Sequence, residues 1–296
     1  FPLIMPQVLS HQQLLAIAGE FGTPLYIYHA ERITEQYRRL QLAFKETDAT
    51  FFYACKALTN INVLKHIKNI GCNADCSSVN EVRLALLAGF EPAKVLYTSN
   101  NIAFSEIEAA VSLGVHVNID SLSNLRKFGE RYGDRYPVGI RLRPNIMAGG
   151  NLKISTGHNK SKFGIPVEAI DQVLDLMKEK KLHIRTLHIH TGSEIKDVEV
   201  FAKGIAVLSE LVKHFPRLEV IDLGGGFKVP YVPGEEGTDV KLLGERVKAE
   251  FETIARKYGR RLQVWFEPGK FLVSEAGYFI VQVNVLKQSG DTCFAG

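Results

Sequence analysis

The feature that most constrains the fold of this chain is a regular alternation of short apolar runs with amphipathic stretches. Each run is rich in β-branched or aromatic residues, and a polar turn and a segment with helical spacing of apolar residues come after it. The runs cover residues 50–55, 72–75, 94–99, 115–120, 138–143, 185–190, 219–224 and 263–268. Eight alternations of strand and helix predict an α/β protein, a (β/α)8 TIM-type barrel.

Segments ahead of this pattern predict further elements. Ser10 and Gln13 fit a capping box, in which the Ser hydroxyl accepts from the third helical amide and the Gln side chain accepts from the cap amide. A helix through Ala18 should follow. We then expect a short strand at 24–28 and a helix at 30–46.

The pattern changes after the eighth run. Residues 277–287 alternate with a period of two and predict a strand whose apolar face holds Phe279, Val281, Val283 and Val285. We therefore expect a barrel with its N-terminal helix and strand over 1–275, and the first strand of a second, β-rich domain over 276–296. Because the chain lacks an initiator Met and stops soon after this strand, we expect the natural protein to extend beyond both ends.

Composition excludes several classes of protein. Hydrophobic residues make up 46% and charged residues 23% of the 296 residues, as in globular proteins with a sizeable core. Apolar runs fall short of the roughly 20 residues needed to span a bilayer, and the first residues lack the pattern of a secretory signal. The net charge of +4 is dispersed, so we expect a cytoplasmic protein that binds neither nucleic acid nor membrane.

Active sites of such barrels lie at the C-terminal ends of the strands, where this sequence carries several polar residues. Lys56 directly follows an apolar run, and burial there would lower the pKa of its amine and favour a Schiff-base nucleophile. A surface lysine is the alternative. Gly224, Gly225 and Gly226 follow the seventh run, where bare backbone amides commonly bind phosphate, although a flexible turn could have the same composition.

A His-x-His pattern and an acid complete the candidate set. His188 and His190 could bind zinc, but zinc sites of barrels need further ligands, and no other strand end carries a histidine. We therefore expect no metal, with His188 in the core beside a functional His190. Glu267 ends the eighth run and could serve as a general base, a metal ligand or the partner of a pyridinium nitrogen.

Six motifs, in this order and spacing, resemble those of the fold-type III decarboxylases of basic amino acids, which depend on pyridoxal 5′-phosphate (PLP). The motifs are YACKA (53–57), ADCSSVNE (74–81), SKFGI (161–165), LHIHTGSEI (187–195), DLGGGF (222–227) and EPGK (267–270). The resemblance covers essentially all of residues 10–296. It implies PLP as cofactor.

Roles for several residues follow from the resemblance. Lys56 would form the Schiff base with PLP, and Glu267 would face the pyridine nitrogen and keep it protonated, so that the ring acts as an electron sink. His190 would stack on the ring, which makes these three the implied catalytic residues. Asp75 would lie near Lys56 and His190 as part of the cofactor site.

The resemblance also implies a phosphate site and a substrate contact. Ser193 and the amides of Gly224, Gly225 and Gly226 would hold the cofactor phosphate. Lys270 stands where the family usually has an Arg that binds a substrate carboxylate. A lysine keeps the charge but loses the bidentate fork of the guanidinium.

The activity that the resemblance favours is decarboxylation of meso-diaminopimelate to L-lysine and CO2, the last step of lysine biosynthesis. Carboxynorspermidine, ornithine or arginine are alternative substrates. A non-catalytic PLP-binding barrel is a further alternative, against which the strand at 277–287 argues. The family implies a homodimer with shared active sites, in which a C-terminal domain beyond Gly296 contributes a Cys, an acid and a Tyr.

Overall fold

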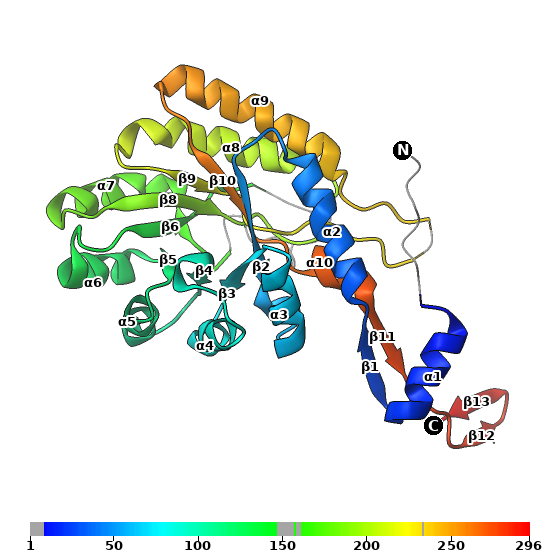
Figure 1. Cartoon of the computed structure of the whole chain (residues 1–296). Helices are drawn as coiled ribbons and strands as arrows, with labels where there is room; N and C mark the ends of the chain where they lie inside the picture. The colour runs from blue at the N-terminus through cyan, green and yellow to red at the C-terminus, as the bar shows by residue number, and fades with distance from the viewer. Residues whose placement is uncertain (1–8, 147–156, 158–160, 233) are drawn as a thin grey trace.

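Parallel strands form a closed ring at the centre of the molecule (Figure 1). The computed structural model describes residues 9–146, 157, 161–232 and 234–296. Within these residues eight strands close the ring, because β5 pairs with β6 and β10 pairs with β2. In ring order the strands are β2 (Ala49–Ala54), β3 (Asn73–Cys76), β4 (Val95–Thr98), β5 (His116–Ile119), β6 (Val138–Arg143), β8 (Ile184–Ile189), β9 (Val220–Asp222) and β10 (Gln263–Phe266). The predicted (β/α)8 barrel is confirmed.

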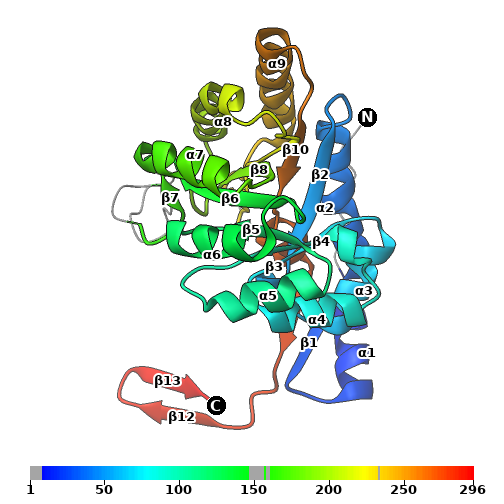
Figure 2. The same ribbon diagram turned by 90° about the vertical axis from the view of Figure 1, so that its left-hand side faces the viewer.

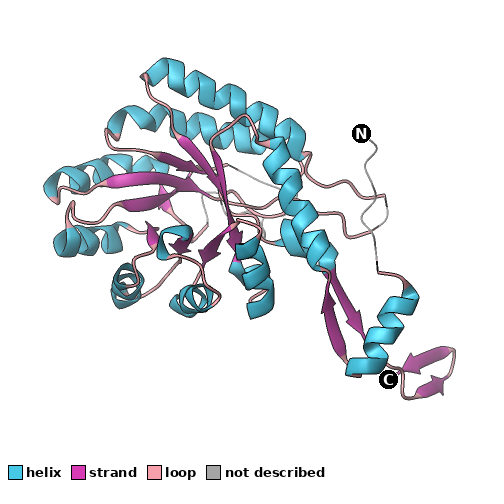
Figure 3. Ribbon diagram, viewed as in Figure 1, coloured by secondary structure: helices cyan, strands magenta, loops and turns pink. Residues whose placement is uncertain are grey.

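Helices surround this ring (Figures 2 and 3). They are α3 (Ile61–Asn69), α4 (Val79–Leu87), α5 (Phe104–Ser112), α6 (Leu122–Tyr132), α7 (Ile170–Glu179), α8 (Glu199–Leu211) and α9 (Val240–Tyr258), with a short α10 (Lys270–Val273) after β10. Between β6 and α7, a two-residue strand β7 (Ile165–Pro166) pairs with the end of β6. The alternation read from the sequence therefore holds for every strand of the ring.

Local side-chain chemistry sets where these helices begin and end. The Ser78 hydroxyl accepts from the Glu81 amide at the start of α4, which satisfies one of the free amides of the first turn. Gly71 and Gly89 follow α3 and α4 with positive φ angles of 88° and 96°, a conformation that costs glycine little. These caps and glycines thus set where the helices begin and end, and with that the bounds of the loops that connect helices and strands.

The N-terminal elements differ from their predicted bounds only at the ends. α1 (His11–Phe21) begins at Ser10 with the expected capping box and runs three residues past Ala18. β1 (Leu25–Tyr28) follows, and α2 (Ala30–Ala43) packs against α9 and α10.

The continuous strand predicted at 277–287 is wrong. β11 covers only Gly277–Ile280 and pairs antiparallel with β1, which is itself four residues long and offers no further partner. A separate hairpin of β12 (Leu286–Ser289) and β13 (Thr292–Ala295) follows, away from the ring (Figure 1). Phe279, Val281, Val283 and Val285 are each more than half exposed. The domain division at residue 275 stays a prediction.

A separate apolar cluster fills part of the barrel interior. Phe52, Leu96, Val220 and Trp265 come from four strands of the ring and are all at most 4% exposed. The rings of Phe52 and Trp265 lie 4.6 Å apart between centroids. Interiors of this kind are close-packed, so each of these side chains supports several strands at once.

We expect Trp265→Ala to lower the free energy of unfolding by about 3–5 kcal/mol, because it removes a large buried ring and leaves a cavity. Urea unfolding followed by circular dichroism measures the change. Leu87→Ala is the control, since Leu87 is 75% exposed and its loss should cost less than about 0.5 kcal/mol. Equal losses in the two variants would contradict the assignment of Trp265 to the core.

Candidate active site

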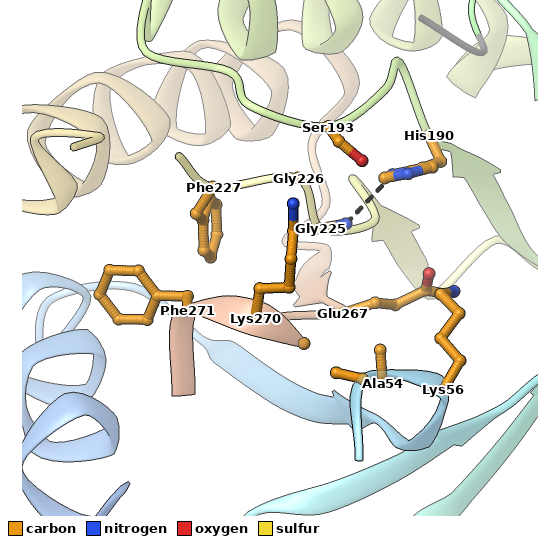
Figure 4. A pocket seen from close by; sticks show the side chains of 12 residues that line it. Ala54, Lys56, His190, Ser193, Gly225, Gly226, Phe227, Glu267, Lys270 and Phe271 are labelled. Carbon is orange, nitrogen blue, oxygen red and sulfur yellow. Dashed lines mark hydrogen bonds between the residues drawn. The ribbon is translucent and has the colours of Figure 1, made fainter. Parts of the chain in front are cut away.

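A pocket of about 360 Å³ opens at the C-terminal ends of the strands (Figure 4). Its lining comprises Ala54, Lys56, Ala57, His190, Ser193, Gly225, Gly226, Phe227, Glu267, Gly269, Lys270 and Phe271. Seven of the nine residues selected from the sequence belong to this lining. The remaining two, Asp75 and Gly224, contact lining residues from behind.

Hydrogen bonds between neighbouring strand ends hold the pocket wall together. The Ala54 amide donates to the Pro268 carbonyl at 3.1 Å, which joins the end of β2 to the turn after β10. The Glu267 amide donates to the Gly224 carbonyl at 2.8 Å, and the Gly225 amide donates to His190 Nδ1 at 3.3 Å. A continuous wall from β2 to β8 therefore carries the candidate residues.

Lys56 lies in a short 3-10 turn, Cys55–Ala57, directly after β2. Its side chain is 58% exposed toward the pocket, and its Nζ lies 3.6 Å from Asp75 Oδ2. The Asp75 carboxylate raises the pKa of Lys56, and this effect outweighs the opposing effect of burial. The sequence-based expectation of a pKa lowered by burial was therefore wrong for this structure, because an acid on the adjacent strand was left out of it.

Asp75 supports Lys56 from the second-last position of β3. Its side chain is 2% exposed, and its Oδ1 has no hydrogen-bond partner in the described part of the chain. Burial raises the pKa of Asp75 to about 8, and the charge of Glu267 acts in the same direction. A buried acid with a free lone pair beside an amine indicates a site built to hold a further polar group.

Glu267 follows β10 and is 6% exposed. Burial raises the pKa of Glu267 well above its usual range, and the charge of Asp222 adds to the effect. Its side chain points into the same part of the pocket as Lys56 (Figure 4). An acid held in this way can donate a proton to, or accept one from, a basic ring nitrogen.

The two histidines take different positions. His188 is fully buried, and its Nε2 lies 3.6 Å from Glu267 Oε1. His190 lines the pocket, where burial and then the charge of Arg141 lower its pKa well below the usual range. A neutral His190 agrees with its Nδ1 accepting the Gly225 amide. The structure therefore separates a core His188 from an accessible His190, as expected.

The three glycines are required by geometry. Gly224 and Gly226 have φ angles of 66° and 95°, which favour glycine. A Cβ on Gly225 would clash with the Glu267 carbonyl, and one on Gly226 would clash with the Gly192 carbonyl. The turn therefore presents bare backbone to the pocket, an arrangement typical of anion sites.

Lys270 lies at the mouth of the pocket and is anchored there. Its ammonium donates to the Glu194 carboxylate and lies 5.7 Å from the centre of the Tyr231 ring. Glu194 also accepts a hydrogen bond of 3.3 Å from the Tyr231 hydroxyl and lies 3.7 Å from Lys228 Nζ.

Sequence reasoning assigned no role to Glu194 or Asp222, although both lie inside motifs that it used. Glu194 directly follows Ser193, and one residue separates Asp222 from the glycine run. For Asp222, its position at the end of a strand was the available signal.

The residues present fit PLP. The pocket volume of about 360 Å³ lies in the range of small-molecule sites. The glycine turn suits a phosphate, the amine suits an aldehyde, and the partnerless Glu267 Oε1 among the described residues suits a ring nitrogen.

Comparison with known proteins decides the family. The family described as "pyridoxal-dependent decarboxylase, pyridoxal binding domain" matches residues 30–274. The chain belongs to this family. It thus carries a PLP-binding barrel of the pyridoxal-dependent decarboxylases, and the implied cofactor is PLP.

Two curated relatives are diaminopimelate decarboxylases. The chain is 34% identical to the diaminopimelate decarboxylase of Methanothermobacter thermautotrophicus over 92% of its own length and 66% of that protein. It is 31% identical to that of Escherichia coli strain K12, over 97% of its length and 68% of that protein. The chain therefore spans about two thirds of the length of these curated relatives.

Solved structures agree with this family. The Helicobacter pylori diaminopimelate decarboxylase complexed with L-lysine superposes with a TM-score of 0.84 at 27% identity, over 95% of this chain and 72% of that one. A further diaminopimelate decarboxylase structure gives a TM-score of 0.86 at 32% identity, over 97% of this chain and 68% of that one. In the described part of the chain, no helix is long and apolar enough to cross a bilayer.

We expect Asp75→Asn to lower the pKa of Lys56, because the Asp75 charge is the largest contribution that raises it. The amine of this variant should become reactive at lower pH. Reductive methylation across a pH series, read by peptide mass spectrometry of the Lys56 peptide, measures the effect. Asp120→Asn is the matched control, since Asp120 is also buried but pairs with Asn100. An unchanged or raised Lys56 midpoint in Asp75→Asn would contradict the pairing.

Proposed function

We propose that the protein decarboxylates meso-diaminopimelate to L-lysine and CO2, using PLP bound at Lys56. The observation that carries the proposal is a single pocket in which Lys56, Glu267 and the glycine turn meet. The family supports the proposal, because the two curated relatives described above, which are 34% and 31% identical to this chain, are diaminopimelate decarboxylases. A related structure holds L-lysine, the product of this reaction.

Each cofactor-site residue has a role in this proposal. PLP, when bound, supplies an electron sink for the carbanion that the loss of CO2 leaves behind. Glu267 would hold the proton of the ring nitrogen and so keep the ring electron-poor. His190, whose pKa is lowered by burial and so favours the neutral form, would lie against the ring. Asp75 holds the Lys56 ammonium at 3.6 Å and fixes the amine at the pocket floor.

The phosphate site is made of backbone and hydroxyl donors. Gly225 and Gly226 line the pocket beside Ser193, and Gly224 shapes the turn through its positive φ. Amide donors hold an anion without a mobile side chain, so the cofactor is oriented by the fold itself.

Lys270 is the proposed contact for a substrate carboxylate. It lies at the pocket mouth, and Glu194 limits the directions in which its flexible chain can point. Because an ammonium lacks the planar fork of a guanidinium, this anchor compensates for part of the lost directionality.

We further propose that the active protein is a homodimer with shared sites. The barrel described here provides the cofactor contacts and one candidate substrate contact. The remaining groups that recognise substrate and protonate the carbanion would come from a partner subunit.

The protein expressed from its complete gene should release CO2 from meso-diaminopimelate and form lysine. Manometry or a coupled CO2 assay measures the rate, and ornithine, arginine and carboxynorspermidine serve as comparison substrates. Specific activity should fall on dilution, because shared sites separate with the subunits. A protein that binds PLP but turns over none of the four compounds would contradict the enzyme proposal, and a preference for another of them would contradict the substrate.

We expect Lys270→Met to raise the KM for diaminopimelate by roughly 10- to 100-fold, the loss expected for one hydrogen bond to a charged group. A contact made equally in the ground and transition states affects KM more than kcat. The visible absorbance of bound PLP should stay unchanged. Lys196→Met is the control, since it breaks an exposed pair with Glu236. An unchanged KM would remove Lys270 from the substrate site.

A further inference from the structure

Asp222 is a buried acid that the proposed function does not use. It ends β9 and has no solvent exposure. Its Oδ1 accepts from the Gly224 amide at 2.9 Å, which explains half of its hydrogen-bonding capacity. Its Oδ2 has no partner within the described residues. A buried carboxylate oxygen without a donor is costly, so a proton donor for Asp222 Oδ2 has to be sought among its neighbours.

Glu267 is the neighbouring acid that can share a proton with Asp222 Oδ2. Ligand atoms of Asp222, Glu267 and His188 all lie within 4.8 Å of one another. All three side chains are at most 6% exposed. Two ionised carboxylates this close in a buried site repel each other strongly, so such pairs retain one proton.

The charges around the pair do not remove this repulsion. Lys56 and Arg141 lower the pKa of Glu267, and Arg141 also lowers that of Asp222, whereas the charge of Asp75 raises the pKa of Asp222. His188 cannot supply a charge, because burial and then the Arg141 charge lower its pKa well below the usual range. The proton therefore has to reside on a carboxyl group.

Hydrogen bonding favours the proton on Glu267, because the Gly224 amide donates to Asp222 Oδ1 and so stabilises the ionised form of Asp222. Burial raises the pKa of Asp222 to about 7, while the amide of Gly224 acts in the opposite direction. Burial raises the pKa of Glu267 well above its usual range, and there the Asp222 charge acts in the same direction. Asp222 is thus the member of the pair favoured as the anion, and Glu267 the member favoured as the acid.

We propose that Asp222 is a positioning residue that shares one proton with Glu267 and keeps it on Glu267 until the ring nitrogen of the cofactor arrives. The proton that the pyridine nitrogen needs is then already present in the pocket. The ring-nitrogen step rests on the proposed function, whereas the carboxyl pair is a property of the chain without cofactor.

The first experiment measures the pair directly. Infrared difference spectroscopy across a pH series follows the carbonyl stretch of protonated carboxyls in the cofactor-free chain, and Glu267→Gln identifies the Glu267 band. In Asp222→Asn the amide oxygen can still accept from Gly224, so the turn is kept, while the negative charge is lost and the second oxygen becomes an amide donor. We expect the Glu267 midpoint to fall by about one pH unit or more.

Two variants control this experiment. Asp120→Asn makes the same change at another buried strand-end acid, which hydrogen-bonds Asn100, and should leave the Glu267 midpoint in place. Asp222→Ser replaces Asp222→Asn if circular dichroism shows that the latter does not fold. An unchanged Glu267 midpoint in the folded Asp222 variant would overturn the proposal, as would an equal fall in Asp120→Asn.

A second experiment tests the link to the cofactor. Calorimetric titration with PLP in buffers of different ionisation enthalpy gives the number of protons taken up on binding. Asp222→Asn should take up more protons at neutral pH than the unsubstituted protein, because its Glu267 has already lost the proton. Equal uptake would overturn the role toward the ring. Neither readout needs turnover, so a protein that fails to release CO2 could still confirm the carboxyl pair.

Discussion

The lateral pairing of β2 with β10 is the constraint on which the rest of the molecule depends. It aligns Phe51 with Phe266, residues more than two hundred positions apart in the sequence, and so closes the ring. Parallel strands all end at one rim, so closure brings Lys56 from the first strand of the ring next to Glu267 from the last. The backbone bond from Ala54 to Pro268 continues this pairing into the loops. Without closure, the amine and the acid would lie on opposite edges of an open sheet.

Closure also creates the electrostatic problem that defines the pocket. Asp75, Asp222 and Glu267 become buried at neighbouring strand ends, with Lys56 and Arg141 as the nearby cations. Burial favours the neutral form of each acid, and their mutual repulsion does the same. A cluster of this kind contributes little to stability by itself, because desolvation offsets much of the attraction between opposite charges. The position of this cluster at the pocket floor therefore fits the binding of a cationic ring and an amine better than a role in folding.

The sequence was sufficient to predict the strands of the ring, but not the pKa values of the charged groups within it. Eight apolar runs and their glycine-terminated helices predicted every barrel strand, because periodicity and helix ends are local properties. The pKa of Lys56 could not be predicted in the same way, since the decisive neighbour, Asp75, belongs to the adjacent strand and its distance depends on the register of β2 and β3. The interaction of Asp222 with Glu267 depends in the same way on two adjacent strands, β9 and β10. The strand at 277–287 failed because alternation indicates a face but not a partner, and β1 offers only four residues.

At the pocket mouth, neighbouring side chains direct a flexible ammonium. A guanidinium at position 270 would carry its own orientation in its planar fork, whereas the Lys270 ammonium depends on neighbours to direct it. Glu194, a residue with a positive φ of 57°, provides that direction by accepting from the ammonium. The same carboxylate contacts Tyr231 and Lys228 from the loop after β9. Three loops are thereby tied together by one acid, so the position of the proposed substrate contact is coupled to the turn that shapes the phosphate site.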